Sequence, residues 1–100
     1  MQQAVRQRIL ASEIDTVAED LQIPRNKDKL KQQAKEIGLS FLSINRNANP
    51  VTVGRASFFI ALRKTDAQAS KNAVPKITRN NGHTNKWWFY LYPVIERTIG

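Results

Sequence analysis

Apolar side chains recur at steps of three and four residues through the first 39 positions of this 100-residue chain. That spacing places them along one side of an α-helix. Pro24 interrupts the pattern, Asn26 is a residue type that caps the start of a helix, and Gly38 is one that ends a helix. Thr16 and Glu19 have the spacing of a capping box, which would divide the segment before Pro24. The sequence therefore predicts about three helices, with the division between the first two left open.

The hydrophobic spacing changes after Gly38. Residues 41–44 are mostly apolar and precede an asparagine-rich loop that ends at Pro50, which is typical of a strand followed by a turn. Apolar residues follow one another over 58–62 in a pattern that favours a strand buried on one face and partly on the other. The alanines within 55–69 favour a helix instead, so both alternatives stay open at this segment.

Asn81-Gly82 is the strongest turn signal in the chain, because a type I′ hairpin turn needs positive φ at both of its central positions. The turn would join strands at 74–80 and 83–92, the second of which is rich in aromatic residues and is followed by Pro93. The chain is thus expected to form an antiparallel hairpin with a basic tip.

Together these patterns predict one α+β domain over residues 1–100. Its helical part would cover 1–39, and its mainly β part would cover 40–100. The expected fold is a group of N-terminal helices followed by a small antiparallel sheet with a basic hairpin, which is the arrangement of a winged helix.

Residues 17–39 carry apolar and small residues at intervals that match a known DNA-binding motif: Val17, Ala18, Leu21, Ile23, Leu30, Ala34, Gly38 and Leu39. In this pattern the segment resembles the helix-turn-helix of DNA-binding proteins, with the last four positions on its recognition helix. The interval from Ile23 to Leu30 is longer than the tight form of the motif has. The resemblance covers less than a quarter of the chain, and it implies binding to a major groove.

Positive charge is concentrated in the second half of the chain. Sixteen Lys and Arg residues stand against eight Asp and Glu residues, a formal net charge of +8. Residues 1–50 carry a net charge of +2 and residues 51–100 a net charge of +6. Folding does not require this imbalance, whereas binding to a polyanion gains from it, because each neutralised phosphate releases counterions. The charge therefore predicts nucleic acid as the partner.

Two segments carry the groups that would contact duplex DNA. In the helix expected over 27–37, three lysines at successive turns suit phosphates and a glutamine beside them suits an adenine edge. The hairpin over 76–86 suits phosphates or a minor groove. A solvated helix face and a plain surface turn are the structural alternatives. The predicted nucleic-acid-binding residues are Arg25, Lys27, Lys29, Lys31, Gln32, Lys35, Arg46, Arg55, Arg63, Lys64, Lys71, Lys76, Arg79, Asn80, His83, Lys86 and Trp88.

The aromatic run at 87–92 would, as a strand, divide between two faces: Trp87, Phe89 and Leu91 on one, and Trp88, Tyr90 and Tyr92 on the other. We expect both faces to be core. Trp88 is the side chain that we single out as able to stack on an unpaired base instead.

The sequence offers little for catalysis. It has no cysteine, and His83 is its only histidine, with no acid near it in the sequence. The basic half lacks the clustered carboxylates that hold Mg²⁺, and no glycine-rich phosphate loop occurs. We therefore predict a protein that is not an enzyme and holds no cofactor or metal. The absence of cysteine, of an apolar leader and of a membrane-spanning run predicts a cytoplasmic protein with no membrane partner.

The predicted function is non-catalytic binding of nucleic acid, with double-stranded DNA preferred, in transcription regulation, replication or the biology of a mobile element. A homodimer on paired half-sites is one option for such a binder. One alternative is an RNA-binding or single-strand-binding module that uses the aromatic sheet. Another is a small interaction or inhibitor protein whose basic surface meets an acidic partner.

Overall fold

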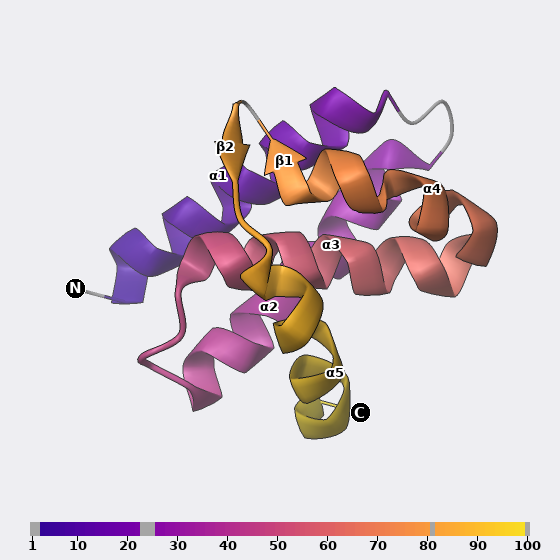
Figure 1. The fold of residues 1–100 in the computed structure, drawn as a ribbon. Helices are drawn as coiled ribbons and strands as arrows, with labels where there is room; N and C mark the ends of the chain where they lie inside the picture. The colour runs from indigo at the N-terminus through magenta and orange to yellow at the C-terminus, as the bar shows by residue number, and fades with distance from the viewer. Residues whose placement is uncertain (1–2, 23–25, 81, 100) are drawn as a thin grey trace.

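A computed structural model describes residues 3–22, 26–80 and 82–99 of the chain (Figure 1). Across these ranges the chain forms five helices and two very short strands. In chain order the elements are α1 (Gln3–Leu21), α2 (Lys27–Ile44), α3 (Pro50–Thr65), α4 (Ala67–Thr78), β1 (Arg79–Asn80), β2 (His83–Thr84) and α5 (Trp87–Ile99). The predicted α+β, winged-helix-like fold is therefore wrong, since the described chain is mostly helical.

Helix α3 runs through the middle of the molecule and contacts each of the other four helices (Figure 1). Every residue from Thr52 to Leu62 is buried. A helix enclosed on all sides is apolar around its whole circumference, so its sequence lacks the one-sided spacing of a surface helix. The strand predicted at 58–62 is wrong for this reason. The helical alternative is correct up to Thr65, where α3 ends and α4 soon begins.

Residues 41–44 continue α2 and do not form the predicted strand. Phe41 and Leu42 are buried and extend the apolar side of α2 beyond Gly38, where the sequence predicted the helix to stop. Gly38 lies where α1 packs closely on α2, because a Cβ atom at this position would lie 2.7 Å from Leu10 Cδ1 and the Leu10 side chain would have to move. The glycine therefore serves helix packing and not helix termination.

Helix α1 is one continuous helix, so the division suggested by Thr16 and Glu19 does not occur. The hydroxyl of Thr16 donates to the carbonyl oxygen of Ser12 one turn earlier, at 2.9 Å. Asn26 precedes α2 in the left-handed conformation (φ 57°), and its side chain makes no capping hydrogen bond, contrary to the prediction. Pro24, the predicted helix breaker, lies outside the described residues.

The hairpin forms where the turn signal placed it, but it is much shorter than predicted. Strands β1 and β2 pair antiparallel, with Asn80 opposite His83. Gly82 adopts a φ of 76°, in the left-handed region that glycine enters at little cost. Asn81 lies outside the described residues, so the type of the turn is not described. The strand predicted over 74–80 is the end of α4 up to Thr78.

Helix α5 takes the place of the aromatic strand predicted up to Tyr92. Trp88, Tyr92 and Ile95 follow helical spacing and pack on the core. The ring centroid of Phe59 on α3 lies 5.0 Å from that of Trp88 and 4.8 Å from that of Tyr92. This packing outweighs the strand preference of aromatic residues, which depends strongly on context.

Candidate nucleic-acid interface

An exposed aromatic pair lies on the first turn of α5. Trp87 is 71% exposed and Tyr90 is 70% exposed, and their ring centroids lie 6.0 Å apart. The two residues are three positions apart, which puts their rings on the same side of the helix. The expectation that both aromatic faces form core is therefore wrong for this pair. A helix divides the side chains of 87–92 between buried and exposed sides differently from a strand.

Trp88 has the opposite environment. Its side chain is fully buried, and the indole Nε1 donates to the hydroxyl of Thr78 at 3.1 Å. The residue chosen from the sequence as a stacking candidate is thus part of the core. Its neighbour Trp87 has the exposure that stacking requires.

The aromatic pair separates two hollows in the surface. The first has a volume of about 540 Å³ and lies between the pair and the loop that joins α2 to α3. Its lining consists of Asn45, Asn47, Ala48, Asn49, Thr52, Trp87, Tyr90 and Leu91. The second has a volume of about 510 Å³ and is lined by Thr84, Asn85, Lys86, Trp87 and Tyr90. Both hollows share the two aromatic side chains, so an extended ligand could contact both at once.

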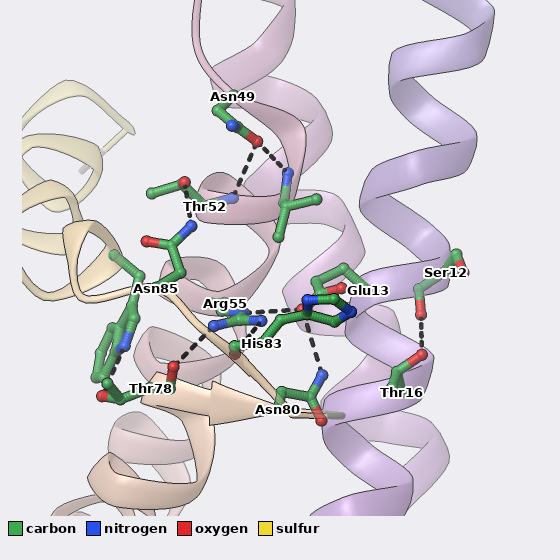
Figure 2. A network of polar contacts seen from close by, with 12 residues as sticks. Ser12, Glu13, Thr16, Asn49, Thr52, Arg55, Thr78, Asn80, His83 and Asn85 are labelled. Carbon is green, nitrogen blue, oxygen red and sulfur yellow. Dashed lines mark hydrogen bonds and ion pairs between the residues drawn. The ribbon is translucent and has the colours of Figure 1, made fainter.

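The loop at 45–49 is held in place by α1 and α3. The buried guanidinium of Arg6 on α1 donates from Nη2 to the carbonyl oxygens of Asn45 and Ala48. Asn49 caps α3 through its Oδ1, which accepts from the backbone N–H of Val51 at 2.9 Å and from that of Thr52 (Figure 2). These contacts fix one wall of the first hollow.

The hairpin is held against α1 and α3 by the buried guanidinium of Arg55 (Figure 2). Arg55 Nε lies 2.8 Å from Glu13 Oε1, while Nη1 and Nη2 donate to the carbonyl oxygens of Thr78 and His83 at 2.9 and 3.2 Å. The same Glu13 oxygen accepts from Asn80 Nδ2 at 3.2 Å. Arg55 and Asn80, both predicted to bind nucleic acid, are therefore buried and position the hairpin.

Asn85 connects the hairpin, α3 and the aromatic pair. Its Nδ2 donates to Thr52 Oγ1 at 2.9 Å (Figure 2). Its Oδ1 accepts from the backbone N–H of Trp87, also at 2.9 Å. Sequence reasoning missed Asn85, although an asparagine two positions before a helix is a common start signal. It missed Trp87 and Tyr90 because strand alternation was assumed.

Exposed basic residues lie beside the aromatic pair and on the elements next to it. Lys86 lines the second hollow, Arg79 lies on the hairpin, and Arg46 lies in the loop at 45–49. The exposed imidazole of His83 also lies on the hairpin. No Asp or Glu occurs in the sequence between Asp66 and Glu96 or between Glu36 and Asp66. The surface on this side of the molecule therefore combines two exposed aromatic rings, amide groups and positive charge.

The lysines of α2 face carboxylates of α1. Lys27 Nζ lies 2.5 Å from Glu19 Oε1, and the Nζ atoms of Lys31 and Lys35 lie 3.1 and 3.2 Å from Asp15 Oδ1. The pKa of Glu19 is lowered by the hydrogen bond and the charge of Lys27. For Asp15, partial burial raises the pKa and is the largest single influence, but the two lysines together lower it overall. The predicted basic stripe is thus partly neutralised within the protein.

The other predicted residues are spread over the surface. Arg63 pairs with Glu96 and lies over the rings of Phe59 and Tyr92. Lys29 and Gln32 are exposed on α2, and Gln32 Nε2 donates to Glu36 at 3.2 Å. Exposed lysines outside the two hollows occur at the end of α3 and on α4: Lys64, Lys71 and Lys76. Arg25 lies outside the described residues.

No three His, Asp or Glu side chains within the described ranges come together in a group that could hold a metal ion. Of the helices in that part of the chain, none has both the length and the apolar character needed to cross a membrane. Comparison of the chain with protein-family models, with curated proteins and with solved structures finds no significant match.

Proposed function

We propose that this chain is a non-catalytic protein that binds single-stranded nucleic acid, RNA or DNA, through Trp87 and Tyr90. The observation that carries the proposal is the exposure of two adjacent aromatic rings on a basic surface. Each ring offers a face on which an unpaired base can stack, and stacking on aromatic side chains is the common mode of single-strand binding.

The charge around the pair supports the same ligand. Lys86 borders one hollow and Arg46 belongs to the loop that borders the other, so phosphates on either side of a stacked base would meet a cation. The absence of cysteine from the sequence fits a reducing compartment, and a cytoplasmic location is part of this proposal.

Single strands are favoured over duplex DNA by two features of the basic elements. The lysine stripe of α2, which would enter a major groove, is paired with Asp15 and Glu19. The hairpin has strands of only two residues, which gives it little reach as a wing. The aromatic pair has no role in groove binding, because bases in a duplex are already stacked on each other.

Substitution of Trp87 tests the stacking role. Trp87→Leu keeps an apolar side chain but removes the aromatic face, and we expect the Kd for a single strand to rise about tenfold, since stacking contributes about 1–3 kcal/mol per base. Trp87→Phe keeps a ring and should lose less. Fluorescence anisotropy of labelled strands at one salt concentration measures both. Equal affinity of the Leu and Phe variants would contradict stacking.

A titration of short single-stranded DNA, RNA and duplex DNA tests the choice of ligand. We expect both single strands to bind more tightly than the duplex, with quenching of Trp87 fluorescence that the Trp87→Phe variant lacks. Tighter binding to the duplex would contradict the proposal in favour of groove binding. Failure of all three ligands to bind would contradict nucleic acid altogether and leave an acidic protein as the partner.

A further inference from the structure

The hollow between the aromatic pair and the loop at 45–49 is lined by three asparagines and no charged side chain. Side-chain amides are suited to hydrogen bonding with base edges, whereas cations are suited to phosphates. If a base stacks on Trp87 or Tyr90, its edge can therefore enter a neutral hollow whose polar groups are amides. Which bases fit depends on whether these amides present oxygen or nitrogen.

The amide oxygens of two of the three asparagines are already used. Asn49 Oδ1 accepts from the first N–H groups of α3, and only an oxygen can accept there (Figure 2). Asn45 Oδ1 accepts from the backbone N–H of Asn47 at 3.3 Å. The Nδ2 groups of both side chains donate to no other described residue. The oxygens thus stabilise the loop, and the N–H donors are left for a ligand.

A hollow that presents N–H donors discriminates between base edges. Uracil and thymine carry a carbonyl oxygen at C4, and guanine carries one at C6. Cytosine and adenine carry an amino group at the equivalent positions, and an amino group facing an N–H donor leaves both groups without an acceptor. The side chain of Asn47 makes no hydrogen bond to a described residue, so it can turn its oxygen to the ring N–H that uracil and thymine carry at N3 and guanine carries at N1.

We infer that this hollow selects unpaired bases with a carbonyl group at C4 (uracil, thymine) or C6 (guanine) over cytosine and adenine, which carry an amino group at the equivalent position. The inference rests on the proposed single-strand binding and adds base preference to it. Asn49 and Asn45 are the residues that determine the preference through Nδ2, and Trp87 and Tyr90 supply the stacking surface.

Short oligo(dU) and oligo(dC) are the matched probes, because uracil and cytosine differ in the C4 substituent and in the ring N–H that accompanies it. We expect oligo(dU) to bind about tenfold more tightly at neutral pH, since a site that hydrogen-bonds one group rejects an analogue that leaves its donors unpaired. Equal or weaker binding of oligo(dU) would overturn the inference while leaving single-strand binding intact. Absence of binding by both oligonucleotides would overturn the inference and the proposed function together.

Two substitutions of Asn49 separate base preference from folding. Ser and Asp both cap helices well, so Asn49→Ser and Asn49→Asp should keep α3 intact while removing the Nδ2 donor. We expect the ratio of the Kd for oligo(dC) to the Kd for oligo(dU) to fall several-fold toward one in both variants. Asp also adds a negative charge, which weakens the binding of both oligonucleotides. Asn72→Asp on α4 adds the same charge outside the hollow and is the control for that effect. A ratio unchanged in both Asn49 variants would overturn the assignment of this residue.

Discussion

At the scale of single residues, burial divides side chains of the same type between structure and surface. Trp88 lies in the core while Trp87, its neighbour in sequence, is almost three-quarters exposed. Arg55 is enclosed between α1, α3 and the hairpin, whereas Arg79 on the hairpin is exposed. Residue type identified the chemistry of these positions, but only the packing determined which side chain of each kind can meet a ligand.

Removal of the Arg55 guanidinium should destabilise the fold strongly. Arg55→Met removes the buried guanidinium that pairs with the Glu13 carboxylate and donates to the Thr78 carbonyl, and we expect a loss of about 3 kcal/mol in the free energy of unfolding, as for other broken buried ion pairs. Urea unfolding followed by tryptophan fluorescence measures this loss.

The double variant Arg55→Met, Glu13→Leu is the matched control. Because it also removes the carboxylate that has lost its positively charged partner, it should recover part of the lost stability. If the double variant loses as much stability as the single variants Arg55→Met and Glu13→Leu lose in sum, the two side chains are not coupled, contrary to the geometry.

At the scale of elements, two contacts between α1 and α2 have different physical origins. Gly38 allows the helices to approach closely at Leu10, while Lys31 and Lys35 of α2 reach the Asp15 carboxylate at the surface. The apolar contact is insensitive to pH, and the ionic one is not. Part of the helix pairing should therefore depend on the protonation of Asp15.

The lowered pKa of Asp15 sets the direction of this dependence. A carboxylate whose pKa is lower in the folded protein adds stability above its unfolded pKa of about 4, and that stability is lost as the pH falls through the folded pKa. Asp15→Asn should therefore cost up to about 0.5 kcal/mol at neutral pH, because the pair is half exposed and screened by water. The difference from the unsubstituted protein should vanish in strong acid.

Thermal unfolding across a pH series measures the effect of Asp15→Asn. Asp20→Asn on the same helix is the control, since Asp20 is exposed and forms no ion pair with a described residue. A constant difference between Asp15→Asn and the unsubstituted protein down to strong acid would exclude the ionic contact as its cause.

At the scale of the whole molecule, the candidate site gathers parts that are far apart in the sequence. The loop at 45–49 and the first turn of α5 meet beside the N-terminal end of α3, where Asn85 bonds to Thr52 (Figure 2). The hairpin is attached to the same helix through Arg55. A central helix thus determines the spacing between the aromatic pair and the surrounding cations.

The position of a lysine relative to the aromatic pair predicts whether it contributes to ligand binding. Lys86 borders the aromatic pair, so Lys86→Ala should reduce the slope of log K against log salt by about 0.7 for single strands, the loss of one phosphate contact. Lys71→Ala on α4 removes another exposed lysine, one that lies outside the site, and should leave the slope unchanged. Equal reductions in the two variants would indicate a diffuse attraction to the whole surface.

Several features could be read from the sequence because they depend on local properties. The one-sided spacing before residue 39 predicted helices, and helices occupy that part of the described chain. Asn81-Gly82 located the hairpin because the φ values of a tight turn restrict residue type. The excess of positive charge follows from composition alone.

The remaining features depended on contacts between distant parts of the chain. Residues 58–62 and 87–92 are helical because α3 is enclosed on all sides and α5 packs on it, and apolar spacing cannot distinguish a fully buried helix from a strand. The partners of the α2 lysines and of Arg55 lie on α1. By itself, then, the sequence determined helices, a turn and a net charge, while tertiary packing decided which aromatic rings and cations stay exposed, because exposure depends on neighbours that local spacing does not encode.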